Sequence, residues 1–351
     1  MLILNHYTQS STNLNMILIT GALGYIASHF AATLASQTQD KMLLLDNADR
    51  PATPLVNYLS SIASQPCEFF HIDILDQASL QYLFKQYPNI HSIIHFAAQK
   101  NVVESIHEPL FYYNENVVGS IELIKVAVEA GVQRFMFSST AAVYSAVTDC
   151  QINESMPTAF NTPYSNSKLM FEQILRDYCQ VHPEFSVIAL RYFNVVGSKI
   201  PKEVGPSIYH PAEDLFASIL KVIHNESPIL NIYGRNYPTK DGTPVRDYIH
   251  VLDIALGHIQ ALTYMQQHRG FDVFNLGCNL GHTVYEIVKL FEKTIERPIP
   301  HQFSSRRPND LGYVVADATK AERLGWKARY SIEECVRDAW ENTYYPALNE
   351  R

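Results

Sequence analysis

The chain has 351 residues, of which 47% are hydrophobic and 18% charged, and its formal net charge is −8. This composition predicts a globular protein of two domains, or of one large domain with an appended lobe. The negative charge argues against nucleic acid or an anionic membrane as a partner, and no apolar run approaches the roughly 20 residues that span a bilayer.

The first 15 residues are polar, rich in Ser, Thr and Asn, and lack the cationic start of a signal peptide. We therefore expect residues 1–15 to be a disordered extension before Met16. The five cysteines are scattered and none forms a C-x-x-C pair, which favours a reduced, cytoplasmic protein. The 14 histidines include no H-E-x-x-H motif and no Cys/His cluster, so we expect no metal site.

The folded part begins with a predicted strand, a glycine turn and a helix. Residues 16–20 are apolar, Gly21 and Gly24 follow, and helical periodicity continues to residue 37. Such a turn lets the backbone approach a pyrophosphate at the positive N-terminus of a helix. Asp46 ends the next apolar run, where a ribose-binding carboxylate belongs, although a strand-end cap is the alternative. Because the nearest arginine is Arg50, we predict NAD rather than NADP.

Strands and helices alternate as far as residue 194, which predicts an α/β fold with a Rossmann-like, doubly wound parallel sheet. The predicted strands are residues 16–20, 41–46, 68–73, 92–98, 134–140 and 186–194. The later predicted helices of this part are residues 79–87, 110–130 and 164–181. Because ligands bind at the carboxyl ends of such strands, we expect one crevice to collect the residues found there. These residues are Gly21, Asp46, Asp73, Ala97, Thr140 and Asn194.

After Gly197 the regular alternation stops, which predicts a smaller mixed α/β lobe. Its predicted strands are residues 229–233, 246–251 and 271–276, and its predicted helices are 212–224, 252–267, 284–295 and 331–344. We predict a dinucleotide-binding domain over residues 16–195 and a substrate-binding lobe over 196–351. Some segments of 228–277 are expected to return to the main sheet.

The chemistry is predicted to lie at Tyr164 and Lys168. Their i, i+4 spacing puts them on one face of a helix. A lysine beside a tyrosine favours the phenolate, which is a base able to take a proton from a sugar hydroxyl. Thr140, at the end of a predicted strand, supplies a second hydroxyl.

Three arginines fall in polar stretches of the predicted lobe: Arg246, Arg306 and Arg307. Bidentate guanidinium groups suit a second pyrophosphate. The alternative for each of them is an ion pair at the surface or between the lobes.

Several motifs, in the same order along residues 16–344, resemble those of the UDP-glucose (UDP-galactose) 4-epimerases of the extended short-chain dehydrogenase/reductase family. The most specific of these motifs is DGTPVRDYIHV at 241–251. The others are TGALGYI at 20–26, HFAA at 95–98, FSST at 137–140, the Tyr164/Lys168 pair, LRYFN at 190–194, and the two arginines, proline and Asp310 within 306–310.

The resemblance implies an NAD-dependent isomerase of carbohydrate (galactose) metabolism. It implies catalytic roles for Tyr164, Lys168 and Thr140, with Lys168 also holding the nicotinamide ribose. The cofactor contacts that it implies are Gly21, Gly24, Tyr25 and Ile26 at the pyrophosphate, Asp46 and Asn47 at the ribose, Asp73 and Ile74 at the adenine, and Phe96, Ala97, Ala98, Lys100, Asn116, Tyr192 and Phe193 along the dinucleotide. The UDP-sugar contacts that it implies are Asn194, Arg246, Arg307, Asp310 and Val314, besides Thr140 and Tyr164.

The reaction implied by this resemblance is reversible oxidation at carbon 4 of a UDP-hexose. Tyr164 takes the proton of the sugar 4-hydroxyl, to which Thr140 also hydrogen-bonds, and hydride passes to tightly held NAD. The resulting 4-keto sugar turns over while UDP stays bound, and hydride returns to the opposite face. The resemblance also implies a homodimer, paired through the predicted helices 110–130 and 164–181.

The chain departs from the family pattern at a few positions. Ala27 replaces the third glycine of the turn, and Glu115 stands where the family has Asn, near the cofactor and sugar. Residues 209–215 replace an Asn-Asn-Leu segment that contacts UDP. Val314 matches the position that limits sugar size in the family, and the resemblance implies that its small side chain would leave space for an N-acetyl group.

Other functions stay open at this point. A 4-epimerase of a UDP-N-acetylhexosamine, UDP-glucuronate or a UDP-pentose fits the same motifs. A nucleotide-sugar 4,6-dehydratase needs an acid, usually in a pair directly after the threonine, whereas Ala141 and Ala142 follow Thr140. A non-catalytic NAD-binding sensor predicts a degraded Tyr/Lys pair, whereas Tyr164 and Lys168 are both present.

Overall fold

The computed structural model describes residues 15–48, 51–145, 150–201, 204, 214–307 and 310–342. Three features of the sequence analysis lie outside the described residues. They are the extension before residue 15, Arg50, which served to choose NAD over NADP, and residues 209–213 of the segment that differs from the family.

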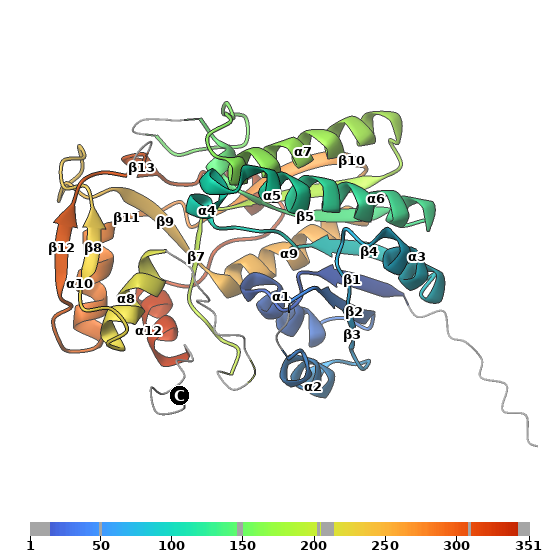
Figure 1. Ribbon diagram of the computed structural model, residues 1–351, viewed down its shortest axis with the longest axis horizontal. Helices are drawn as coiled ribbons and strands as arrows, with labels where there is room; N and C mark the ends of the chain where they lie inside the picture. Colours follow the sequence, from blue (N-terminus) through green and yellow to red (C-terminus); the bar gives the residue numbers. More distant parts are fainter. Residues whose placement is uncertain are drawn as a thin grey trace, which may run out of the picture.

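A parallel sheet forms the centre of the molecule (Figure 1). Its strand order is β10-β6-β5-β4-β1-β2-β3. The strands are β1 (Met16–Thr20), β2 (Lys41–Asp46), β3 (Glu68–His71), β4 (Ile90–His95), β5 (Arg134–Thr140), β6 (Ser186–Tyr192) and β10 (Gly270–Leu276). Every neighbouring pair is parallel. The order reverses between β1 and β4, so the doubly wound topology predicted from the alternation is confirmed.

Helices cover both faces of this sheet, which explains why its strands are almost continuously apolar. One face packs against α1 (Tyr25–Ala35), α2 (Thr53–Ile62) and α9 (Val251–Met265). The opposite face packs against α3 (Gln77–Gln86), α6 (Gly119–Glu129) and α7 (Pro163–Val181). Side chains alternate between the two cores along each strand; in β1, for example, Ile17 and Ile19 enter one core and Leu18 enters the other.

The helix predicted over 110–130 is divided in the structure. It consists of α5 (Pro109–Tyr113), a π-helical turn η1 (Asn114–Val118) and α6. Hydrophobic periodicity could not predict the π-helical turn, because this turn depends on the contacts that its side chains make with other elements. Three further α-helices were not predicted from the sequence: α2, α4 (Val102–His107) and α11 (Thr319–Glu322).

The segment after β6 begins a second group of elements. A four-stranded sheet contains β7 (Asn194–Val196), β9 (Val245–His250), β11 (Gly281–Thr283) and β13 (Tyr313–Val314), and a two-stranded sheet pairs β8 (Leu230–Tyr233) with β12 (His301–Ser304). With α8 (Leu215–Ile223), α10 (Val284–Thr294) and α12 (Ile332–Asn342), these strands form what we call the C-terminal lobe, which has its own apolar core (Figure 1). Two short helices complete the described elements: η2 (Ala141–Val143) and α11 (Thr319–Glu322).

The strand predicted over 186–194 is interrupted at Phe193, which separates β6 of the large sheet from β7 of the C-terminal lobe. The chain later returns, because β10 pairs with β6 and α9 packs on the large sheet. The C-terminal lobe therefore lies beside the carboxyl ends of the large sheet, where a ligand crevice is expected (Figure 1).

Candidate active site

The glycine turn after β1 brings two strand ends into close contact. Gly21 has a φ of +67°, and a Cβ there would lie 2.6 Å from the backbone nitrogen of Ala97, so only glycine fits. The Asp46 carboxylate accepts hydrogen bonds of 2.9 Å from the backbone N–H groups of Leu23 and Ala48. Asp46 therefore does cap its strand end, the alternative considered from the sequence, and it also holds the glycine turn in place.

A crevice of about 800 Å³ opens at these strand ends. Its volume suits a large cofactor. Of the predicted catalytic and cofactor residues, those that line it are Gly21, Gly24, Tyr25, Ile26, Asp46, Asn47, Ile74, Phe96, Ala97, Ala98, Lys100, Thr140, Tyr164, Lys168, Tyr192 and Phe193.

Two predicted cofactor residues, Asp73 and Asn116, are not among the residues that line the crevice. Asp73 accepts hydrogen bonds from the Asn47 side chain (2.9 Å) and from the backbone N–H of Leu75 (2.8 Å). Asn116 is buried in the π-helical turn, where its amide bonds both backbone polar groups of Gln99 and donates to the Ser167 hydroxyl at 3.0 Å. Both residues thus hold the wall in shape.

The catalytic pair is presented by the start of α7. Thr162 caps the helix in a capping box and Pro163 occupies its first turn, so the helix begins just before Tyr164. Lys168 follows one turn later and is buried, with its Nζ donating to the Ser138 carbonyl at 2.9 Å. Tyr164 and Lys168 line the crevice together with Thr140, the last residue of β5.

Burial perturbs both titratable groups of this pair. It lowers the pKa of Lys168 to about 7, and the nearby carboxylate of Glu172 opposes this shift. Burial also raises the pKa of Tyr164, which the hydroxyl of Thr140 partly offsets. Each charged form is penalised by the apolar surroundings, so a phenolate and an ammonium placed here stabilise each other.

Tyr192 lines the crevice next to this pair, and a histidine fixes its hydroxyl. The Tyr192 hydroxyl lies 2.7 Å from Nε2 of His258, whose Nδ1 lies 2.8 Å from the carbonyl of Ile254. Because that carbonyl requires a proton on Nδ1, Nε2 accepts and Tyr192 donates. Burial lowers the pKa of His258 to about 4, which keeps the ring neutral.

A second cavity of about 400 Å³ lies in the C-terminal lobe. The predicted substrate residues Asn194, Arg246, Arg307 and Asp310 line it, and Asn194 and Arg307 line the crevice as well. The two spaces therefore adjoin. Arg246 and Asp310 form an ion pair, with 2.5 Å between Nη2 and Oδ1.

The remaining arginine and Val314 lie elsewhere. Arg306 is absent from both linings, because its guanidinium stacks on Tyr237 at 3.8 Å and bonds Asn236, as the surface alternative requires. Val314 packs against the small apolar cluster that contains Ala141 and Phe193. Val314 thus lies behind the residues that border the crevice.

Glu115, noted as a departure in the sequence, lines the crevice as a carboxylate. Burial and the charge of Asp73 raise its pKa. Other lining residues were given no role in the sequence analysis, because a polar residue taken by itself resembles an ordinary surface position. These include Ser138 and Glu104 in the crevice, Lys221, Asn231, Tyr233 and Tyr248 in the second cavity, and Asp214 in both.

Among the described residues, no helix is long and apolar enough to cross a membrane. Within the same residues, no group of His, Cys, Asp and Glu is arranged to hold a metal ion.

Comparison with known proteins gives consistent relatives. A family model described as GDP-mannose 4,6 dehydratase matches residues 18–339. The chain is 41% identical to a UDP-glucose 4-epimerase of Erwinia amylovora, covering 92% of this chain and 96% of that protein. It is 38% identical to the UDP-glucose 4-epimerase of Bacillus subtilis, covering 92% and 95%.

Solved structures give the same relatives. The UDP-glucose-4-epimerase of Stenotrophomonas maltophila, with bound NAD and formylated UDP-arabinopyranose, has a TM-score of 0.88 and 36% identity, covering 94% of this chain and 98% of its own. That of Bifidobacterium longum, in complex with NAD+ and UDP, has a TM-score of 0.86 and 35% identity, covering 93% and 97%.

Proposed function

Because the chain belongs to the UDP-glucose 4-epimerase family, we propose that it catalyses NAD-dependent epimerisation at carbon 4 of a UDP-hexose, interconverting UDP-glucose and UDP-galactose. One observation carries the proposal most directly. Tyr164, Lys168 and Thr140 line a cofactor-sized crevice that adjoins a second cavity containing two arginines and a lysine. This arrangement would bring a hydride acceptor, a base and a diphosphate site together.

The residues present fit NAD. Gly21 and Gly24 line the crevice at the start of α1, where the N-terminus of the helix would receive the pyrophosphate. Asp46, Asn47 and Ile74 line the same crevice and would hold the adenosine half, and Lys168 would hold the nicotinamide ribose. When bound, NAD supplies a hydride acceptor and donor beside Tyr164.

The protein's own contribution is proton transfer and orientation. Tyr164, as the phenolate, takes the proton of the sugar 4-hydroxyl and later returns it. The Thr140 hydroxyl hydrogen-bonds the same sugar oxygen, and the Lys168 ammonium stabilises the phenolate. Both functions follow from their places beside Tyr164 in the crevice.

The second cavity is assigned to UDP. Arg246 and Arg307 line it and would bind the diphosphate, with Asp310 orienting Arg246 through their ion pair. Asn194 borders both spaces and would contact the sugar. With UDP held there, the 4-keto sugar can turn over in the crevice and present its other face for hydride return.

A 4,6-dehydratase is the second candidate, because the matching family model carries that description. Elimination of a hydroxyl needs a proton donor beside Thr140. Ala141 and Ala142 occupy η2 directly after it and provide none. Glu172, a buried carboxylate close to Lys168, is already paired with Arg191. The site therefore favours epimerisation.

A panel of substrates tests the assignment. We expect purified protein to convert UDP-glucose and UDP-galactose into a common equilibrium mixture, measured by chromatographic separation of the epimers. UDP-N-acetylglucosamine, UDP-glucuronate and UDP-xylose test the alternative substrates, and GDP-mannose tests the dehydratase. Conversion of GDP-mannose to a 4-keto-6-deoxy sugar without epimerisation of any UDP-sugar would contradict the proposal, as would bound NAD without turnover.

We also propose a homodimer. Large apolar side chains are exposed on α4, α5, η1 and α7, which pack side by side. Leu110 is the most exposed of them, at 82%. The others are Val102, Val103, Ile106, Phe111, Val118, Met170 and Val181. A patch of this kind marks a protein contact, and a second copy presenting the same helices would cover it.

Replacement of Leu110 by Asp should convert the dimer to a monomer, because it places a charge in the apolar contact. Light scattering during gel filtration measures the mass. Leu280→Asp is a matched control, since Leu280 is also exposed, at 58%, but lies between β10 and β11. A monomeric unaltered chain, or a dimer that survives Leu110→Asp unchanged, would contradict the assignment.

On its cysteine pattern, the protein is assigned to the cytoplasm.

A further inference from the structure

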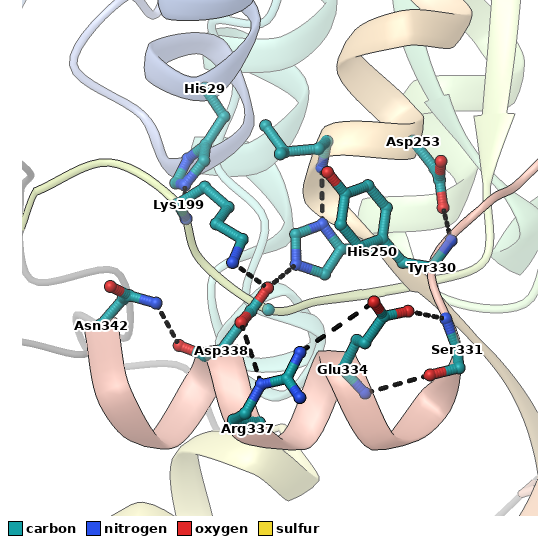
Figure 2. Close-up of polar contacts among 12 residues, drawn as sticks. His29, Lys199, His250, Asp253, Tyr330, Ser331, Glu334, Arg337, Asp338 and Asn342 are labelled. Carbon is teal, nitrogen blue, oxygen red and sulfur yellow. Dashed lines mark hydrogen bonds and ion pairs between the residues drawn. The ribbon is translucent and has the colours of Figure 1, made fainter.

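A buried carboxylate lies between the C-terminal lobe and the large sheet. Asp338, on α12, is 1% exposed and points toward the side chains of Lys199 and His250 (Figure 2). Its Oδ2 lies 2.8 Å from Nζ of Lys199 and 3.3 Å from Nε2 of His250. Arg337 approaches less closely, at 3.9 Å, and is half exposed.

The charge state of this group follows from its contacts. The backbone N–H of Leu252 donates to Nδ1 of His250 at 3.1 Å, so the proton of the neutral ring is on Nε2, facing Asp338. Burial lowers the pKa of His250 to about 4, although Asp338 opposes the shift. His250 is therefore neutral near pH 7, and Lys199 is the nearest charge that balances Asp338.

The segment that contains Lys199 is held from the other side by α1. The hydroxyl of Tyr25 donates to the carbonyl of Gly197 at 2.5 Å. The backbone N–H of Lys199 donates to Nε2 of His29 at 3.1 Å, while Nδ1 of His29 lies 2.8 Å from the carbonyl of Tyr25. We call Tyr25, His29, Gly197, Lys199, His250 and Asp338 the Asp338 cluster.

Gly197 makes this arrangement possible. Its φ is +83°, and a Cβ there would lie 2.4 Å from the His250 ring. The backbone of residue 197 thus packs directly on the histidine that faces Asp338. Nothing in the predicted reaction uses these contacts.

The Asp338 cluster lies at the end of the strand pair that carries the substrate residues. β7 runs parallel to β9, with Asn194 opposite Tyr248 and Val196 opposite His250. Gly197 and Lys199 follow β7 directly, and His250 is the last residue of β9. Asn194 and Arg246, on these strands, line the substrate cavity.

We propose that Asp338 is a positioning residue for the substrate cavity. This inference rests on the proposed function. By holding Lys199 and His250, Asp338 fixes the ends of β7 and β9 against α1, and so sets where Asn194 and Arg246 face the diphosphate. Tyr25 belongs to the Asp338 cluster and lines the cofactor crevice, so the same contacts align the two binding sites with each other.

A buried ion pair is a poor source of stability alone, because desolvation opposes its attraction. It does restrict geometry, because the ammonium and the imidazole must both face one carboxylate. Small displacements of binding groups are costly, and a shift of about 1 Å can reduce activity roughly 10²-fold. Positioning is therefore the role that we test.

The experiment measures UDP binding to the NAD-loaded full chain by titration calorimetry. We expect Asp338→Asn and Lys199→Met each to raise the Kd for UDP by about tenfold or more, with bound NAD unchanged. Lys199 is 41% exposed at its side chain, so its variant retains the fold. Lys199→Arg should restore affinity. Lys289→Met is the matched control, since Lys289 pairs with Glu292 on the outside of α10 in the same lobe.

Stoichiometry and Kd separate positioning from stability. A purely structural role would lower the melting temperature and the binding fraction but leave the Kd of the folded fraction unchanged, which would overturn the inference. The double variant Lys199→Met/Asp338→Asn should bind UDP with a Kd no higher than that of the weaker-binding single variant, because the two residues act as a pair. If the two increases in Kd multiplied in the double variant, the inference would be overturned. Absence of UDP binding by the unaltered chain would overturn the proposed function as well.

Discussion

Replacing Tyr164 by Phe is expected to lower kcat by at least roughly 10²–10⁴-fold, the usual contribution of a positioned base. The substitution removes only the hydroxyl that takes the sugar proton. The ring remains at the start of α7, whose capping by Thr162 and Pro163 is unaffected. NAD content and the melting temperature should therefore stay close to those of the unaltered chain.

Tyr178→Phe provides the control, because it removes the same atom from the same helix, where Tyr178 stacks on His182 at 4.3 Å. Initial rates with UDP-galactose, circular dichroism and acid-released NAD are the measurements. Full activity in a folded Tyr164→Phe protein would remove the basis for assigning the reaction to this site. Loss of bound NAD together with activity would indicate a binding role for the hydroxyl instead.

The second large effect is expected at the buried ion pair between Arg191 on β6 and Glu172 on α7. Arg191 and Glu172 have side chains 4% and 2% exposed and form a bidentate contact of 3.0 and 2.5 Å. The Ser139 hydroxyl also donates to Glu172. Arg191→Met leaves this carboxylate buried without its partner, which should lower the free energy of unfolding by about 3–5 kcal/mol.

The double variant Glu172→Met/Arg191→Met tests the cause. Replacing both charges by apolar groups leaves no uncompensated charge, so most of the lost stability should return. Urea unfolding at a fixed NAD concentration measures this, because bound cofactor adds to apparent stability. A double variant as unstable as the sum of its single variants would show that packing, rather than the unpaired charge, explains the loss.

The parts of the candidate site that could be predicted from the sequence depend on short-range rules. The i, i+4 spacing of Tyr164 and Lys168 places both on one helix face wherever that helix lies. The glycine turn follows from backbone sterics at Gly21. Strand ends gather at one edge of any parallel sheet, so Asp46 and Thr140 were expected to share a crevice, and both line it.

The predictions that differ from the structure depend on neighbours distant in the chain. Asn116 lies next to the crevice, but its amide is engaged by Gln99 and Ser167 from other elements. The helix expected over 110–130 contains a π-helical turn at the same place. Arg306, expected as one of three similar arginines, is held on Tyr237 at the surface. Side-chain contacts of this kind produce no periodic pattern in the amino-acid sequence.

The amino-acid sequence by itself determined the α/β class, the parallel doubly wound sheet and the Tyr164/Lys168 pair, because these follow from periodicity, local sterics and helix geometry. Only the tertiary structure decided that the cavity of the C-terminal lobe adjoins the crevice through Asn194 and Arg307. The same is true of Asp338, which meets Lys199 and His250 although all three are remote in the chain. The physical reason is that burial and long-range pairing depend on how elements pack, which no local pattern encodes.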